Sequence, residues 1–274
     1  MGGHIVSLPS PSLNGSVTDL FEPARVKAPV NAAGRLLAVL DAFGPDSLAL
    51  SLTGIARRSG LSLSTAHRLV HELAEWGALE RDASGRYTIG VRLLELAALA
   101  PRGLALREAA FPALDDLHHR TRGNVHLGVL DGTKVVYVEA IRACATSPTK
   151  GRAGDRQPVH ASGIGLVLLA HADRAFQERV LSGPLEKLTP LTVTDPAELR
   201  RRLAQVRRSG YAVATGQITL PDVVVAVPVR DPCGTVVAAV SVVVEAARAR
   251  PRVLASLLAG ASAEITRRMA APAP

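Results

Sequence analysis

Cysteine is scarce in this sequence, which contains only Cys144 and Cys233, far apart along the chain. A disulfide-stapled secreted domain, or a zinc site built on cysteine pairs, needs more cysteines at closer spacing, so both classes are excluded. This content fits a reducing compartment. We interpret both thiols as packed or loop residues, and redox sensing is the alternative.

Long hydrophobic runs are missing as well. The most apolar stretch, residues 236–244, contains Ser241 and falls well short of the ~18 residues that a membrane helix needs. The first residues, Met1 to Ile5, lack the basic and apolar segments of a secretory signal. We therefore expect a cytoplasmic protein with no membrane partner.

The motifs of common enzyme classes are incomplete. Gly163-Ile164-Gly165 lacks the third glycine of a dinucleotide loop, and the chain has no Gly-Lys-Ser/Thr phosphate loop. Ser162 follows His160 without the glycine elbow of a hydrolase. Five histidines lack the spacing of a metal-ligand pair beside a carboxylate, and we interpret them as structural. They are His118, His119, His126, His160 and His171. We predict no catalytic residue, no metal and no cofactor.

The length of 274 residues, with 47% hydrophobic and 20% charged residues, predicts two packed domains. The net charge of +8 is unevenly placed, because residues 1–92 hold nine Lys/Arg against eight Asp/Glu. The remaining 23 basic and 16 acidic residues are spread over the larger part of the chain. A surplus spread in this way is typical of a solvated surface, so charge alone gives weak support for a nucleic-acid partner.

The N-terminal part of the chain shows the pattern of a winged helix-turn-helix. Residues 1–30 contain four prolines among polar residues and are predicted to be a flexible tail. Apolar spacing and capping residues predict helices at 31–43, 51–58 and 62–77, with Gly60 making the turn between the last two. Residues 78–90 alternate as a small hairpin around Asp82 to Gly85. We assign the DNA-binding domain to residues 31–90.

The next segment carries more apolar surface than one solvated helix should show, which indicates a partner. Its leucines are Leu93, Leu94, Leu96 and Leu99. We predict a linker helix over residues 91–106. Beyond it, residues 107–274 predict strands at 125–129, 135–141, 223–229 and 235–244. Helices are predicted beyond Pro112 and at 162–172, 195–210 and 251–269, which makes an α+β fold.

The third predicted helix has a polar outer face. Short donors and an arginine on one helix face suit phosphates and base edges. The candidate residues are Ser64, Thr65, His67 and Arg68 on this helix, with Arg81, Ser84 and Arg86 on the wing. The alternative is an ordinary solvated helix surface. The order of a short helix, a glycine turn, a polar-faced helix and a wing favours DNA binding.

Several short motifs follow one another in a characteristic order. In the first third they are Arg35, Leu37, Leu40, Ile55-Ala56, Gly60-Leu61, Ser64-Thr65, His67-Arg68-Leu69, Leu73, Gly77, Leu79-Glu80-Arg81, Gly85-Arg86-Tyr87 and Gly90. Later they include Pro158-Val159-His160-Ala161-Ser162-Gly163, Leu168-Leu169-Ala170, Gly210-Tyr211-Ala212, Ala226-Val227-Pro228-Val229 and Val237-Ala238-Ala239-Val240-Ser241-Val242. Over about residues 31–270 the chain resembles the IclR-type bacterial transcription regulators.

The resemblance implies a winged helix-turn-helix joined by a linker helix to a GAF-like α/β effector-binding domain. It also implies a homodimer or a dimer of dimers that binds double-stranded operator DNA and a small-molecule effector. The family's effector contacts correspond here to Gly163, Ile164, Ala214, Asp222, Val224, Ser241 and Val243. The alternative for this set is a conventional helix start beside a filled core.

The chain departs from the family pattern around this set. Leu166 stands where a lysine is frequent, and residues 214–217 lack the usual acidic residues. Pro221-Asp222 replaces a glycine step. Since apolar side chains would dominate the wall of the pocket, we expect a larger, partly apolar organic acid as the effector.

The hypothesis is therefore a sequence-specific transcription regulator whose operator binding responds to a small molecule. The first alternative is a small-molecule enzyme whose winged helix pairs subunits. The second is a protein-interaction module. Salt-dependent and sequence-selective binding to DNA would discriminate against both alternatives.

Overall fold

The computed structural model describes residues 31–44, 46–99, 104–142 and 151–270. The tail predicted at 1–30 and Cys144 lie outside these residues, and Cys233 is an exposed free thiol. The chain divides into two compact units, residues 1–96 and 97–274. Within the described ranges, no helix has the length and apolar character needed to cross a membrane.

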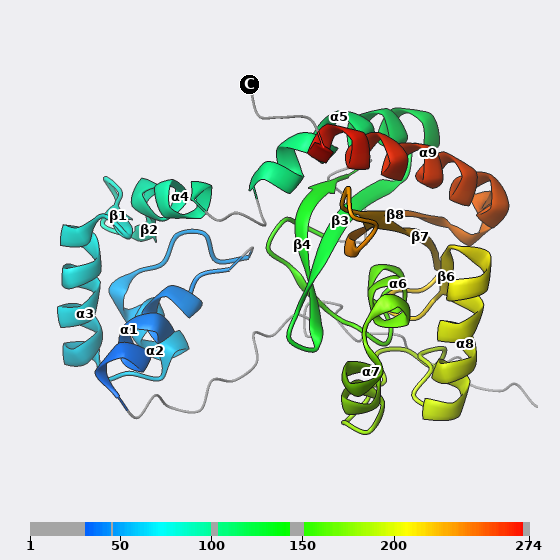
Figure 1. Ribbon diagram of the computed structural model, residues 1–274. Helices are drawn as coiled ribbons and strands as arrows, with labels where there is room; N and C mark the ends of the chain where they lie inside the picture. The colour runs from blue at the N-terminus through cyan, green and yellow to red at the C-terminus, as the bar shows by residue number, and fades with distance from the viewer. Residues whose placement is uncertain (1–30, 45, 100–103, 143–150, 271–274) are drawn as a thin grey trace, which may run out of the picture. The chain divides into compact units, whose positions relative to one another are not determined.

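The first unit contains helices and one hairpin in the predicted order (Figure 1). Its elements are α1 (Ala32–Asp41), α2 (Leu52–Ser59), α3 (Leu63–Trp76), β1 (Leu79–Arg81), β2 (Tyr87–Ile89) and the start of α4 (Val91–Ala98). Side chains of Asn31, Ser51 and Ser62 accept backbone N–H bonds at the first turns of α1, α2 and α3. Gly60 ends α2 with φ of 68°, a conformation that costs glycine little, and the chain turns there into α3.

A small core holds this unit together. Val39 of α1, Ile55 of α2 and Leu69 and Leu73 of α3 are buried against one another and against Leu79 of β1. One side of α3 is therefore committed to the core, and its other side is left to solvent. The winged helix-turn-helix predicted from the sequence is confirmed.

The predicted linker helix over residues 91–106 is wrong in its C-terminal part. Helix α4 ends at Ala98, and α5 (Leu104–Thr121) begins as a separate helix in which Leu106 is buried in the core of the second unit. Pro101 and Gly103 disfavour a continuous helix over residues 91–106. The prediction gave the leucine pattern more weight than these two residues. The domain boundaries at 30, 90 and 106 stay predictions.

The second unit is built on a six-stranded antiparallel sheet in the order β5-β4-β3-β8-β7-β6. The strands are β3 (Asn124–Asp131), β4 (Lys134–Ile141), β5 (Arg156–Pro158), β6 (Ala212–Thr215), β7 (Asp222–Arg230) and β8 (Val236–Glu245). The helices are α5, α6 (Gly163–His171), α7 (Arg174–Leu181), α8 (Pro196–Ser209) and α9 (Pro251–Ala270), with a short 3₁₀ turn, η2 (Ala246–Arg248). This confirms the α+β fold.

Helices cover both faces of this sheet (Figure 1). On one face α5 and α9 bury Leu117 and Ile265 against Val125, Val227 and other strand residues. On the other face α6 packs on the sheet and α8 packs on α6, with Ile164 and Leu203 in the same core. Alternate strand residues face the two cores because successive side chains of a strand point to opposite sides.

The helix α7, the short 3₁₀ turn η2 and the strands β5 and β6 were not predicted. Asp173 caps α7, since its carboxylate accepts the N–H of Phe176 at 2.7 Å, and this capping signal was visible in the sequence. The two strands are short and lie at the sheet edges. Helix α5 also starts before Pro112 rather than beyond it.

Candidate functional site

The outer face of α3 is polar and exposed. Ser64, His67 and Arg68 are exposed, while Leu69 and Leu73 on the opposite side are buried. Thr65 differs from its neighbours, because it is half-buried and its hydroxyl accepts a 2.9 Å bond from the Ser62 hydroxyl. Helix α3 thus presents three of its four candidate residues freely, and Thr65 also supports the helix start.

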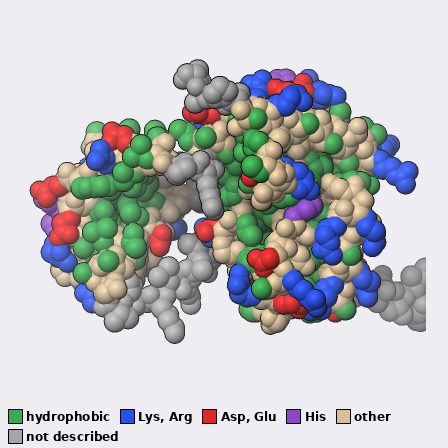
Figure 2. Space-filling model, viewed as in Figure 1, with side chains coloured by type: hydrophobic (Ala, Val, Ile, Leu, Met, Phe, Trp, Pro, Cys, Tyr) green, Lys and Arg blue, Asp and Glu red, His purple; other side chains and the backbone are tan. Residues whose placement is uncertain are grey.

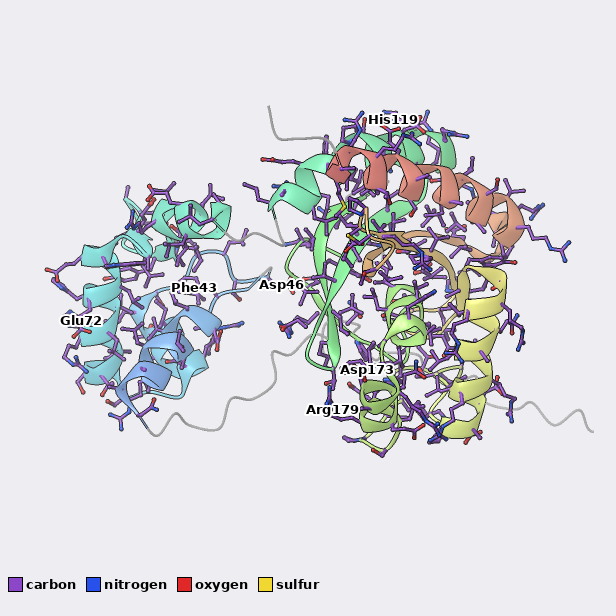
Figure 3. The ribbon with its side chains drawn as sticks, in the orientation of Figure 1. Phe43, Asp46, Glu72, His119, Asp173 and Arg179 are labelled. Carbon is purple, nitrogen blue, oxygen red and sulfur yellow. The ribbon has the colours of Figure 1, made fainter. Side chains whose placement is uncertain are left out.

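Arg68 forms an ion pair with Glu72 on the exposed face of α3. Its Nη1 atom lies 2.5 Å from Oε1 of Glu72, one helical turn further on, and both side chains are well exposed. Glu72 lies on the outer side of α3 (Figure 3). An exposed ion pair of this kind contributes little stability, so the guanidinium can exchange Glu72 for another anion at small cost. Inspection of the sequence had missed this partner, although the i,i+4 spacing was a signal for it.

The wing is organised by one carboxylate. Asp82 Oδ1 accepts the backbone N–H groups of Ser84 and Arg86, both at 2.9 Å, and the Ser84 hydroxyl at 2.6 Å. The Ser84 hydroxyl bond, followed by the backbone bond from Arg86, lowers the pKa of Asp82 below its ordinary value. This turn leaves Ser84 and Arg86 exposed at the tip.

Arg81 and Arg86 are the two exposed cations of the wing. Arg81 donates to the Gly85 carbonyl at 3.3 Å and lies over the Tyr87 ring, and Arg86 donates to the Ser84 hydroxyl at 3.2 Å. These contacts place both arginines on either side of the same turn, Asp82 to Gly85. The unit therefore presents two groups of donors, one on α3 and one on the hairpin.

The seven candidate effector residues come from three neighbouring strands and one helix start. Ala214 of β6 pairs with Val224 of β7, which pairs with Val243 of β8. Two residues further along the same pair of strands, Ser241 of β8 pairs with Ala226 of β7. All these side chains belong to the sheet face that α6 covers, by the alternation along each strand. Ser241 and Ala214 are buried, and Val224 is half-buried.

Helix α6 begins directly against this row. A Cβ atom on Gly163 would come within 2.7 Å of the Val224 side chain, so only glycine allows the helix start to approach β7 this closely. The Ser162 hydroxyl accepts the N–H of Gly165 at 3.0 Å. Among the described residues, nothing accepts a hydrogen bond from the N–H groups of Gly163 and Ile164, which is the usual state of a helix N-terminus.

Two polar residues near this row have structural roles. The buried Gln217 side chain accepts the N–H of Val193 at 2.9 Å and donates to the carbonyls of Leu191 and Thr215. The backbone of Asp222 accepts the N–H of Gly216 at 2.8 Å and donates to Thr219. Together they fix the loop before β7. Leu166 is buried in the α6 core.

The structure separates one histidine from the other four interpreted as structural. A ring nitrogen of each of these four lies 2.9 Å from a backbone carbonyl oxygen. They are His118, His119, His160 and His171. His126 has no such partner although it is 1% exposed. Its position opposite Ser241 on β8 places it beside the candidate effector residues, a relationship that required the strand pairing.

Comparison with known proteins gives the family. The model of the IclR helix-turn-helix domain matches residues 32–83, and that of the bacterial transcriptional regulator IclR C-terminal domain matches residues 99–266. The chain belongs to the IclR family. It is a transcription regulator with a helix-turn-helix and an effector-binding domain.

Individual family members support this assignment. The HTH-type transcriptional regulator XynR of Escherichia coli is 34% identical over 214 residues, which are 77% of this chain and 85% of that protein. The p-hydroxybenzoate hydroxylase transcriptional activator of Acinetobacter baylyi is 30% identical over 239 residues, 85% of this chain and 88% of its own length. Both of these relatives are named as regulators of transcription.

A solved structure provides the corresponding comparison in three dimensions. The crystal structure of an IclR homolog from Microbacterium hydrocarbonoxydans, complexed with 4-hydroxybenzoate, is 38% identical to this chain. It covers 88% of this chain and 99% of its own, with a TM-score of 0.82. That IclR homolog therefore shares the fold of this chain and holds an aromatic hydroxy acid.

Proposed function

We propose that α3 and the wing together read the operator. The observation that carries this proposal is the exposed polar face of α3, whose other face is anchored in the core. In helix-turn-helix proteins the second helix of the motif enters the major groove, and here that helix is α3. Ser64, Thr65, His67 and Arg68 would then contact bases and phosphates, with Arg68 the candidate reader of guanine.

The wing would contact the flanking backbone or minor groove. Arg81, Ser84 and Arg86 supply two permanent cations and a hydroxyl on one rigid turn. Cations at this position neutralise phosphates and add affinity without reading the sequence. In this proposal, α3 supplies the sequence specificity of DNA binding and the hairpin supplies affinity that does not depend on sequence.

The assembly that fits this reading is a pair of copies joined through the first unit. An apolar hollow of about 520 Å³ is lined by Leu40, Phe43, Leu48 and Ile89. Figure 2 shows hydrophobic side chains gathered on this unit, and Val91, Leu94 and Leu96 of α4 are exposed too. A large exposed apolar surface is typical of an interface. Two copies would place two α3 helices in successive major grooves, about 34 Å apart.

The second unit would bind an organic acid on the α6 face of the sheet. The N–H groups of Gly163 and Ile164 suit a carboxylate, since a helix N-terminus carries a partial positive charge. Val224 and Val243 offer apolar surface beside them, and Ser241 offers a hydroxyl group. The 4-hydroxybenzoate held by the Microbacterium homolog is an acid of this partly apolar kind. Ligand binding would change the spacing of the two α3 helices through the linker.

The decisive experiment is selection of genomic fragments by the full chain, followed by footprinting at several salt concentrations. We expect a protected site with two half-sites and an affinity that falls steeply with salt. Equal retention of all fragments would contradict operator reading. Since such a regulator binds genomic DNA, we propose that it acts in the cytoplasm. We also propose that its role is gene regulation rather than catalysis.

A further inference from the structure

His126 is buried in the second unit without a hydrogen-bond partner. Within the described residues, its Nδ1 and Nε2 are the only buried side-chain nitrogen or oxygen atoms that lack one. Leaving a buried polar group unpaired costs about 1–3 kcal/mol, so such groups are rare in folded proteins. An imidazole retained in this state indicates a partner that arrives from outside the chain.

The surroundings of His126 fix the plane of its ring. The ring stacks on Tyr137 of β4, with centroids 4.6 Å apart and planes inclined by 16°. The backbone of Gly151 lies against the ring edge, since a Cβ atom there would approach Nε2 to 2.4 Å. The imidazole is thus held in one plane, and a partner can be recognised only along that plane.

Burial also determines the charge of this ring. Desolvation lowers the pKa of His126 to about 4, so the ring is neutral at physiological pH. A neutral imidazole has one N–H donor and one acceptor nitrogen. A carboxylate can satisfy only the donor, because it has no proton to give. Gly151 lies against Nε2, so a ligand would meet Nδ1. A hydroxyl group can meet that nitrogen in either tautomer, because it both donates and accepts hydrogen bonds.

The pairing of the strands relates the position of His126 to the start of α6, where the carboxylate of the effector is proposed to bind. His126 pairs with Ser241, and Ser241 pairs with Ala226, which lies 3.5 Å from the Cβ position of Gly163. Two strand spacings separate His126 from Ala226, or about 10 Å between their backbones. A hydroxyl at His126 and a carboxylate at Gly163 would therefore belong to opposite ends of one ring-sized molecule.

We propose that His126 is a specificity-determining residue of the effector site, which selects aromatic acids that carry a hydroxyl group opposite the carboxylate. This inference rests on the effector site proposed above. Ser241 lies between the two ends and can support either polar group. Val224 and Val243 provide the apolar surface for the ring of the ligand.

The test compares two pairs of acids that differ in one hydroxyl group. Isothermal titration of the full chain would use 4-hydroxybenzoate against benzoate, and 4-hydroxyphenylacetate against phenylacetate. We expect the hydroxylated member of at least one pair to bind about tenfold more tightly or better, which corresponds to about 1.4 kcal/mol. His126→Phe should abolish this preference, so that the two members of a pair bind with nearly equal affinity.

The matched control is His119→Phe, which changes an exposed histidine on α5, on the opposite face of the sheet. It should keep the preference of the wild type. The ring ¹⁵N resonances of His126 should also shift when the hydroxylated acid is added, a response that a purely packing role would not produce. Far-UV circular dichroism and operator binding of each variant report whether it folds.

Two results would overturn the proposal. One is a His126→Phe variant that folds and still prefers the hydroxylated acid, and the other is absence of binding by all four acids to a wild-type chain that binds its operator. The second result leaves DNA reading intact. Loss of operator binding in the unliganded wild type would instead contradict the proposed function, and the acid preference would still be decided by titration.

Discussion

Glu80 of the wing accepts, through Oε1, a 2.8 Å hydrogen bond from the backbone N–H of Val91. Val91 is the first residue of α4, so a wing side chain caps the helix that leaves the DNA-binding unit. Arg92 adds a second tie, since its guanidinium lies 5.6 Å from the centre of the Trp76 ring on α3. The first turn of α4 is therefore held to both parts of the unit proposed to touch DNA.

Glu80→Ala should weaken this unit. Removing a helix-capping acceptor costs about 0.5–2 kcal/mol, and the Val91 N–H loses its partner. Urea unfolding followed by tryptophan fluorescence would measure the loss, because Trp76 is the single tryptophan and lies beside Arg92. Glu108→Ala, at an exposed residue of α5, is the control and should leave this transition in place. A midpoint shared by Glu80→Ala and the wild type would contradict the capping role.

Arg68→Ala should lower the affinity for the operator by about 1–3 kcal/mol if Arg68 reads a guanine. Fluorescence anisotropy with operator and scrambled duplexes would separate this effect from loss of a phosphate contact, which weakens both duplexes alike. Arg201→Ala removes an equally exposed, ion-paired arginine from α8 and serves as the control. Unchanged binding of both duplexes by Arg68→Ala would remove Arg68 from the interface.

Glu72→Gln should strengthen DNA binding at low salt. Glu72 places a negative charge 2.5 Å from the Arg68 guanidinium, and a phosphate approaching Arg68 meets that charge. The glutamine keeps the size of the side chain and removes the repulsion. The gain should shrink as salt rises, because exposed charges are screened within about 10 Å at 0.1 M. A gain independent of salt would argue against this electrostatic origin.

Acid should destabilise the second unit through His126. The pKa of His126 is about 4 in the folded chain against an ordinary 6.5, so the unfolded chain binds the extra proton between these values. The stability conferred by the neutral ring is complete above pH 6.5 and is lost as the pH falls to about 4. The loss is on the order of 3 kcal/mol. His126→Phe should flatten the dependence of the unfolding free energy on pH in this window, and His119→Phe should not. Urea titrations followed by circular dichroism would measure both.

Leu94→Asp should separate the copies. Leu94 is 66% exposed on α4, and an aspartate there would bury a charge in the proposed contact between two first units. Sedimentation velocity should show a fall to the mass of one chain, together with weaker operator binding. Val253→Asp changes an exposed apolar residue of α9 and is the matched control. A Leu94→Asp variant with the wild-type mass would rule out this surface as the contact.

Local signals sufficed for most of the elements. Asn31, Ser62 and Asp195 cap helices where the sequence predicted them, because a cap depends on a side chain and a backbone N–H two or three residues away. The strands around Val125 and Val225 follow from alternation and β-branched residues. The overlong linker helix was wrong because the leucine pattern was given more weight than Pro101 and Gly103.

The features of the proposed DNA contact also depended on local information. The exposed face of α3 could be predicted, since helical periodicity divides buried from exposed residues within one element. The Asp82 turn and the Glu72 partner of Arg68 are also local, and the sequence contained their spacing. None of these required distant parts of the chain to meet.

The order of residues along this chain was enough to specify its helices, its hairpin and the polar side of α3, because those features arise from interactions between near neighbours. The isolation of His126, its stacking on Tyr137 and its alignment with Ser241 came from the pairing of strands far apart in sequence. Whether a buried polar atom finds a partner depends on every segment packed around it, and folding of the whole second unit settles that outcome.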